Sequence, residues 1–117
     1  MKKFLAIYYG SPESMNKWAN LSEAAKQDRQ KEGIKTWAGW AEKNSKLIKD
    51  MGSPLGKTKK VDPKGVSDTK NQLTAYTIVE AETHEQAAKL FLNHPHFEIF
   101  PGDSIEIMEC LPLPGQK

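Results

Sequence analysis

Two histidines separated by a single proline, His94 and His96, are the side chains best suited to acid–base chemistry. A neutral imidazole near pH 7 can take up a proton, release one or bind a ligand. Asp68 is a third candidate, because a carboxylate in a cleft can orient a histidine or hold a cation. We therefore name Asp68, His94 and His96 as candidate catalytic residues. In the alternative interpretation the histidines shape the end of a helix, and Asp68 belongs to a turn.

Aromatic side chains form a second group of candidates. Tyr8, Trp37, Trp40 and Tyr76 could line an apolar pocket in which phenol and indole groups fix a ligand. The alternative is that Trp37 and Trp40, three residues apart on a helix, pack into the core. We predict these four as ligand-binding residues and keep core packing as the alternative.

Other kinds of chemistry find little support in the sequence. It has no cluster of Cys and His that would supply the four ligands of a structural zinc ion, so we expect no metal. It also has no glycine-rich phosphate loop, serine nucleophile elbow or paired-carboxylate motif, so we expect no cofactor. Cys110 is the single cysteine, which predicts a reducing, cytoplasmic location, and we expect its thiol to be buried and inert.

The charge is distributed unevenly along the 117 residues, although the formal net charge is only +2. Residues 1–70 carry 15 basic and 8 acidic side chains, whereas residues 71–117 carry 2 basic and 7 acidic ones. The densest basic run, residues 57–70, lacks aromatic stacking partners and a reading helix, so we do not expect a nucleic-acid partner. The longest apolar run, Phe4 to Tyr9, is far shorter than the roughly 18 residues of a membrane span, so we expect no membrane partner. The asymmetry then favours packing of one half, or one subunit, against the other.

The hydrophobic pattern predicts which elements position these residues. Ser11 and Pro12 are typical of a helix start, Gly33 of a break, and Gly52 of a helix end. The predicted strands are residues 3–9, 55–61 (an edge strand), 73–80 and 104–111, and the predicted helices begin near 12, span 37–51 and run from 83 to about 93.

This order, one strand, a long broken helix, two strands, one helix and one strand, is the ferredoxin-like α+β pattern. We predict one domain over residues 1–117, with a four-stranded antiparallel sheet and helices on one face. The first strand is apolar on both faces, which predicts that a second copy covers the other face. The expected assembly is therefore a two-fold homodimer with a barrel-like centre.

Three segments, residues 52–61, 65–97 and 104–115, resemble the YCII-related domain, also called the DGPF domain. The Trp-Ala-Gly-Trp segment at 37–40 is similar to the corresponding helix in a subgroup of small bacterial members. The resemblance implies a ferredoxin-like fold, a dimeric α/β barrel and a small-molecule cleft beside the sheet, without a known reaction. Asp68 is the residue that matches the family's Asp-Gly-Pro-Phe segment, and the histidine that members carry on the first helical region has no counterpart here.

These observations lead to two main hypotheses of function. In the first, the protein is a dimeric binding module whose cleft holds an unidentified small polar or aromatic molecule. In the second, it is a cofactor-free lyase, isomerase or hydrolase that uses His94 or His96 as acid or base, with Asp68 as the orienting group. A third possibility is that the dimer only stabilises a partner.

Overall fold

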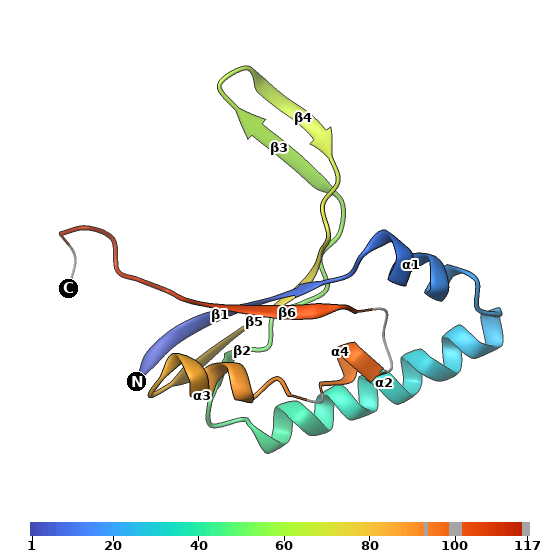
Figure 1. The fold of residues 1–117 in the computed structure, drawn as a ribbon, viewed down its shortest axis with the longest axis horizontal. Helices are drawn as coiled ribbons and strands as arrows, with labels where there is room; N and C mark the ends of the chain where they lie inside the picture. The colour runs from blue at the N-terminus through green and yellow to red at the C-terminus, as the bar shows by residue number, and fades with distance from the viewer. Residues whose placement is uncertain (93, 99–101, 116–117) are drawn as a thin grey trace.

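The fold is α+β, with helices on one side of a four-stranded antiparallel sheet (Figure 1). The computed structural model describes residues 1–92, 94–98 and 102–115. The strand order is β2-β5-β1-β6, formed by Ile48–Asp50, Leu73–Ala81, Lys2–Tyr9 and Ser104–Glu109. This is the ferredoxin-like arrangement that the sequence predicted.

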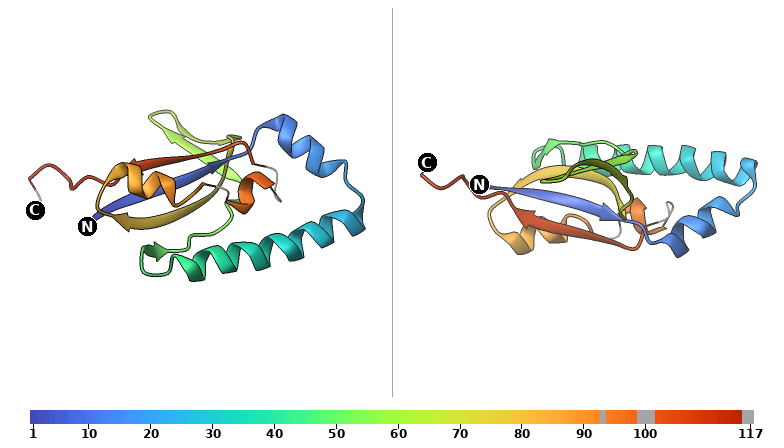
Figure 2. Two further views of the ribbon diagram at one scale, coloured as in Figure 1. Left: turned by 60° about the horizontal axis from the view of Figure 1, so that its bottom comes forward. Right: turned by 90° about the horizontal axis from the view of Figure 1, so that it is seen from above.

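The two central strands, β1 and β5, owe their place to residues that are apolar on both faces. Leu5 lies opposite Ile78, and Phe4 lies opposite Val79. Phe4, Ala6 and Tyr8 point to the helix side and are fully buried, together with Val79 and Ala81. Leu5, Ile7 and Ile78 point to the other side, which no described helix covers (Figure 2).

Two helices follow β1, α1 (Pro12–Ala19) and α2 (Glu23–Lys43). The hydroxyls of Ser11 and Ser22 accept hydrogen bonds from the backbone N–H groups of Ser14 and Ala25, so each serine caps one helix. The predicted break at Gly33 is wrong, because the chain breaks earlier, at the Ser22 cap, and Gly33 is buried within α2.

The predicted helix over residues 37–51 is also wrong in its second half. The Asn44 backbone N–H and side-chain amide both donate to the Trp40 carbonyl, which closes α2. Ile48 then pairs with Val79 in the sheet, so β2 occupies the edge position that we predicted for residues 55–61. Tertiary pairing here overrides the helical spacing of the apolar residues.

Residues 55–61 contribute instead to a separate hairpin of β3 (Thr58–Asp62) and β4 (Gly65–Thr69). The predicted turn between them is confirmed, since the Lys64 backbone N–H donates to Asp62 Oδ1 at 2.9 Å. The hairpin projects from the side of the sheet opposite to the helices (Figure 1). We call residues 58–69 the arm.

The last helices are α3 (His84–Lys89) and the short α4 (Pro95–Glu98). Thr83 caps α3 as predicted, by accepting from the Gln86 backbone N–H, while the Gln86 side chain accepts from the Glu82 N–H. This helix ends at Lys89, earlier than predicted, and Asn93 lies outside the described residues. In the part of the chain that is described, no helix has both the length and the apolarity needed to cross a membrane.

Beyond β2, the segment Met51 to Pro54 continues the edge of the sheet without forming a regular strand. The Ser53 carbonyl accepts from the Tyr76 N–H at 3.4 Å, and the Leu55 N–H donates to the Thr74 carbonyl at 2.8 Å. Gly52 has a φ of 71°, and a Cβ there would lie 1.7 Å from the Tyr76 carbonyl oxygen. A glycine is therefore required for this segment to approach β5 so closely.

We expect Gly52→Ala to lower the free energy of unfolding by about 2–3 kcal/mol, through strain at positive φ and the clash with β5. Gly39→Ala is the matched control, because it lies inside α2 and a Cβ there meets nothing within 4 Å. That change should raise stability by about 0.5–1 kcal/mol. Urea denaturation of both variants checks the pair, and equal effects would contradict the assigned backbone geometry.

Candidate functional site

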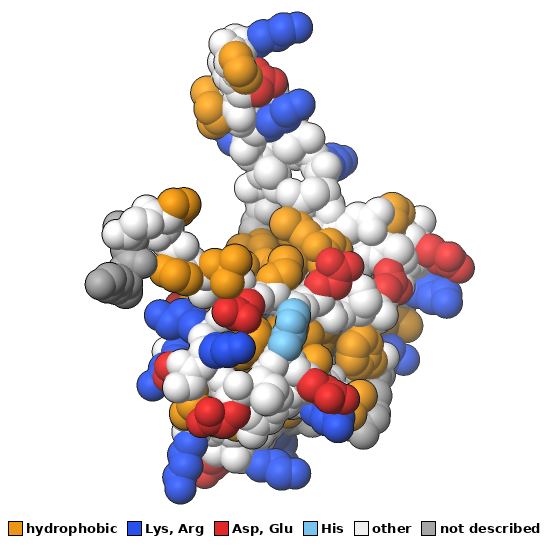
Figure 3. Space-filling view, turned by 60° about the vertical axis from the view of Figure 1, so that its left-hand side comes forward, with side chains coloured by type: hydrophobic (Ala, Val, Ile, Leu, Met, Phe, Trp, Pro, Cys, Tyr) orange, Lys and Arg blue, Asp and Glu red, His pale blue; other side chains and the backbone are white. Residues whose placement is uncertain are grey.

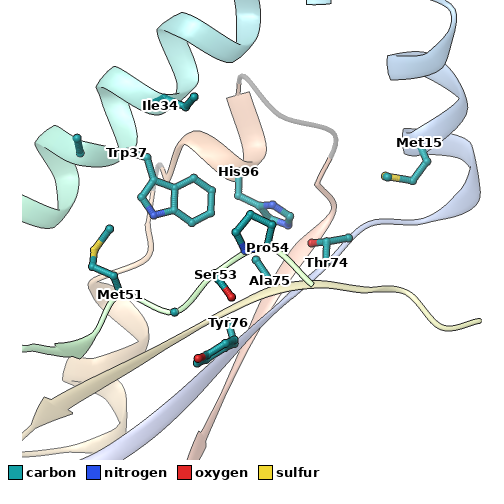
Figure 4. A pocket seen from close by; sticks show the side chains of 12 residues that line it. Met15, Ile34, Trp37, Met51, Ser53, Pro54, Thr74, Ala75, Tyr76 and His96 are labelled. Atoms are coloured by element: carbon teal, nitrogen blue, oxygen red, sulfur yellow. The ribbon is translucent and has the colours of Figure 1, made fainter. Parts of the chain in front are cut away.

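A pocket of about 500 Å³ lies between the helices and the irregular edge of the sheet (Figure 4). Trp37, Ile34 and Ala38 of α2 form one wall. The facing wall and the ends come from other elements: Met51, Gly52, Ser53 and Pro54, Thr74, Ala75 and Tyr76 of β5, Met15 of α1 and His96 of α4. Carbon and sulfur atoms dominate this lining, so the pocket is apolar.

Part of the pocket lining is exposed to solvent. Ile34 and Met15 line it and are still 66% and 43% exposed. Exposed apolar side chains at the rim of a cavity are typical of a binding-site mouth, since they gain contacts when a ligand enters. A molecule can therefore enter from solvent without displacing the sheet.

His96 is the histidine that lines the pocket. It lines the pocket, is 3% exposed, and its Nε2 lies 2.9 Å from the Tyr9 carbonyl. Burial lowers the pKa of His96, against the opposing effects of backbone hydrogen bonds to Tyr9 and Ser104 and of the charge on Asp103. The ring is thus neutral near pH 7, and its Nε2 donates to the Tyr9 carbonyl.

The His96 ring packs directly against the backbone of Gly102. A Cβ at Gly102 would lie 2.2 Å from ring atoms of His96. The next residue, Asp103, accepts hydrogen bonds from the Ser11 backbone N–H at 2.5 Å and from the Ser14 hydroxyl. These bonds lower the pKa of Asp103 and attach the start of α1 to the start of β6, beside His96.

His94 lies behind the pocket wall rather than in it. It is fully buried, with Trp37 and Trp40 packed edge-on against its ring at centroid distances of 4.3 and 4.5 Å. Its Nδ1 accepts from the His96 backbone N–H at 3.1 Å, which places the proton of the neutral ring on Nε2. Burial, assisted by the charge of His96, lowers the pKa of His94 to about 3.

A directed chain of hydrogen bonds leads from His94 to the pocket edge. His94 Nε2 lies 3.4 Å from the Tyr8 hydroxyl, and that hydroxyl lies 2.9 Å from Thr77 Oγ1. Thr77 Oγ1 donates to the Met51 carbonyl at 3.1 Å. Because His94 Nε2 donates and the Met51 carbonyl accepts, Tyr8 must donate to Thr77. Burial raises the pKa of the Tyr8 phenol, so it keeps the proton this chain needs.

The predicted site residues therefore separate into distinct groups. His94 and His96 lie next to each other, but only His96 lines the pocket among these two. Asp68 lies on the exposed arm, where its Oδ1 pairs with Lys59 Nζ at 2.5 Å. The structure does not bring Asp68 to the histidines within one chain. Asp103 is instead the carboxylate whose charge acts on His96.

Of the four predicted aromatic residues, two line the pocket. The Trp37 ring points into the pocket, whereas Tyr76 lines it from β5 with its ring turned to the other side of the strand (Figure 4). Tyr8 lies underneath, stacked on Trp37 at 5.1 Å. Trp40 packs on Phe91 at 5.2 Å, and its Nε1 donates to the Leu90 carbonyl at 2.8 Å. Core packing, the alternative interpretation, thus describes Tyr8 and Trp40.

Sequence reasoning missed the residues that complete the pocket. Ile34 and Ala38 lie on the same helix face as the predicted Trp37, but the break predicted at Gly33 separated Ile34 from the helix start. The contribution of residues 51–54 had no such signal, because it depends on a pairing with β5 across the fold. Cys110, expected to be buried, is exposed, since β6 ends at Glu109. No group of three metal-ligating side chains occurs among the described residues.

Comparison with known proteins gives a likeness of fold. No family model matches the sequence, and no curated protein matches it significantly. One solved structure that matches is 5-chloro-2-hydroxyhydroquinone dehydrochlorinase from Burkholderia phenoliruptrix AC1100, in complex with 2,5-dihydroxybenzoquinone. The match has a TM-score of 0.53 and 17% sequence identity, and it covers 91% of this chain and 90% of that one. It shows that the two chains share a fold.

Tyr8→Phe should lower the free energy of unfolding by about 1–3 kcal/mol, because His94 Nε2 and Thr77 Oγ1 each lose a buried partner. Thr77→Val removes the same bond from the other side, so the double variant should cost less than the sum of the two. Tyr9→Phe is the control, since Tyr9 faces the other side of the sheet. If the effects of Tyr8→Phe and Thr77→Val on the free energy of unfolding in urea are additive, the hydrogen bond between Tyr8 and Thr77 is contradicted.

Stability should fall as the pH is lowered from about 6.5 toward 4.5. The unfolded chain binds a proton at His94 with its ordinary pKa of 6.5, whereas the folded chain binds it only near 3. The unfolded state therefore holds more protons in this range, and the free energy of unfolding rises with pH by up to about 1.4 kcal/mol per unit. His96 acts in the same direction, while Asp103 contributes only at lower pH. Urea denaturation at several pH values tests this, with His94→Gln as the comparison. The prediction is refuted if the free energy of unfolding depends on pH equally in the wild type and in His94→Gln.

Proposed function

We propose that this protein binds a flat, uncharged, mostly apolar small molecule, of the size of one or two aromatic rings, in the pocket beside Trp37. The observation that carries the proposal is the apolar pocket of about 500 Å³ with one neutral histidine in its wall. Its volume lies within the usual range of ligand sites, roughly 300–1,000 Å³. The sequence predicted a small polar or aromatic ligand, and the apolar lining of the pocket favours an aromatic one.

The charge of the lining argues for an uncharged ligand. Among the described residues that line the pocket, none is Lys, Arg, Asp or Glu. A charged molecule would lose its hydration on entry and find no opposite charge to replace it, which is costly. The Trp37 indole offers a broad face against which a ring can pack.

One polar group on the ligand is expected to face His96. Because Nε2 is bound to the Tyr9 carbonyl, Nδ1 is the acceptor that the ring can offer to a hydroxyl of the ligand. The Ser53 and Thr74 hydroxyls line other parts of the pocket and can bond further polar groups. The shared fold with an enzyme that was solved with a dihydroxybenzoquinone supports a hydroxylated ring as ligand.

We further propose that the chain is a YCII-related domain that forms a homodimer. The sheet face that carries Leu5, Ile7 and Ile78 has an apolar centre flanked by Lys3, Glu80 and Glu106, and no described helix lies over it. Covering this face with the same face of a second copy buries both without a further protein.

A cofactor-free enzyme is the second candidate, and the observation that favours it is the position of His96. An unprotonated Nδ1 in a dry pocket can remove a proton from a bound hydroxyl or carbon acid, and the imidazolium formed can return it. Asp103 would stabilise that imidazolium, whereas Asp68 would not do so within one chain and His94 is enclosed by aromatic rings.

We expect 2-naphthol to bind saturably and to change the tryptophan fluorescence, at least about tenfold more tightly than charged 2-naphthoate. Ala38→Phe, which adds a ring to the α2 wall of the pocket, should abolish binding measured by calorimetry. Trp37→Ala should weaken it about tenfold or more. Trp18→Phe, a change on α1 outside the pocket lining, is the control. Undiminished binding to Ala38→Phe, or equal affinity for both probes, would refute the proposal.

A further inference from the structure

The arm stands apart from the main sheet and is held by contacts within the hairpin. It is a two-stranded sheet that does not join the main sheet, and every residue of β4 is exposed. A lone two-stranded hairpin is marginally stable in water and needs a surface to pack on. The projecting arm also helps to give the chain a radius of gyration of 16.2 Å, where a compact chain of this length has about 13 Å.

The arm carries an apolar pair that is suited to such packing. Val61 and Val66 lie directly opposite each other in the hairpin, so their side chains share one face. They are 76% and 68% exposed. Two similarly exposed apolar side chains, Leu111 and Leu113, lie in the segment that follows β6. We call residues 110–115 the tail. Neither pair covers the other within one chain, since all four remain at least 66% exposed.

Arm and tail lie on the side of the sheet that the helices leave uncovered. Figure 1 shows both rising from the sheet away from the helices, and Figure 3 shows hydrophobic side chains gathered between the base of the arm and the tail. The uncovered face, with Leu5 and Ile7 at its centre, lies between them. A molecule that stacks on this face will therefore meet both appendages.

The charges of the two appendages are complementary. Five lysines lie on the arm or next to it, and ion pairs join Lys59 to Asp68 and Lys60 to Asp62. Among the described residues, the structure gives no ion pair to the other three, Lys57, Lys64 and Lys70. The strand that leads into the tail, β6, exposes Glu106 opposite Ile7 on the uncovered face, and the described chain likewise provides no ion pair for it. A basic arm thus meets a carboxylate and the apolar tail on this side of the sheet.

We propose that the arm is a clasp between two copies of this chain: in the dimer, the arm of each copy packs on β6 and the tail of the other. A second copy is the occupant because both complementary surfaces lie on one chain and on the same side of its sheet. A two-fold axis through the uncovered face then produces two equal contacts. The proposal rests on the proposed dimer and goes beyond it, since sheet stacking alone assigns no role to the arm.

Sedimentation equilibrium over a wide concentration range tests the clasp. The Val61→Ser, Val66→Ser double variant should raise the dimer dissociation constant about tenfold or more, while monomer stability is unchanged because both side chains are exposed. Leu92→Ser is the matched control, as it removes a side chain that is 68% exposed and follows α3 on the helix side. Ile7→Arg, in the centre of the sheet face, tests the dimer itself and should give a monomer.

The outcomes separate the clasp from the proposed dimer. If the wild type is a dimer that Ile7→Arg dissociates, but the double valine variant dimerises as the wild type does, the clasp is overturned and the dimer stands. A wild type that is monomeric throughout overturns both.

Disulfide trapping locates the contact. Under mild oxidation, Val66→Cys should yield a cross-linked dimer through the exposed Cys110 of the other copy, and adding Cys110→Ser should abolish it. Cross-linking that persists without Cys110, or none in a protein that sediments as a dimer, would overturn the placement of the arm on the tail.

Discussion

The need to satisfy one buried phenol determines much of this structure. Tyr8 lies at the centre of the sheet with no exposed surface, so its hydroxyl must find partners inside the protein. It finds them on two elements far apart in the sequence, Thr77 of β5 and His94 before α4. Thr77 in turn holds the Met51 carbonyl, and His94 holds the first turn of α4 through the His96 N–H. Met51 and His96, which line the pocket, are therefore positioned by bonds that begin at Tyr8, and Trp37 of the α2 wall stacks on its ring. An unpaired polar group at this buried position would cost more free energy than one hydrogen bond contributes. Loss of any one partner therefore destabilises the whole network of hydrogen bonds.

The two histidines differ in role because they differ in what their nitrogen atoms face. His94 has both nitrogens occupied by protein groups and aromatic rings on several sides, so nothing from solvent can reach it. His96 has one nitrogen on the Tyr9 carbonyl and lines the pocket. The bond from the His96 N–H to His94 Nδ1 links them, and the structural histidine thereby fixes the backbone of the accessible one. A sequence in which two histidines flank a proline does not distinguish these roles, since they depend on contacts with residues more than 80 positions away.

What the sequence predicts well is what local patterns encode. A run apolar on both faces identified β1, β-branched and aromatic residues identified β5, and alternation identified β6. The Ser11 and Thr83 caps identified two helix starts. The ferredoxin-like order followed from these elements. Two of the failures depend on packing beyond the local sequence, since Gly33 is buried inside α2 and β2 forms by pairing with Val79. The third is local, because residues 58–62 of the predicted edge strand pair with residues 65–69 in the arm. Trp37 was identified as a pocket residue by its type, while the facing segment of residues 51–54 became visible only through its bonds to β5.

The uneven charge of the chain acquires a spatial meaning in this fold. Where the two halves of the sequence meet inside one molecule, opposite charges pair, as Lys49 and Glu80 do at 2.7 Å between neighbouring strands. The remaining excess is carried outward, positive on the arm and negative on β6. Two copies brought together in any arrangement that aligns like appendages would set lysines against lysines, which is unfavourable, whereas the two-fold arrangement sets arm against β6 twice. Exposed surface pairs of this kind contribute little affinity, so the apolar contacts must supply most of it. In the proposed dimer, the charge asymmetry would act mainly to select one relative orientation of the two sheets among those that bury the same face.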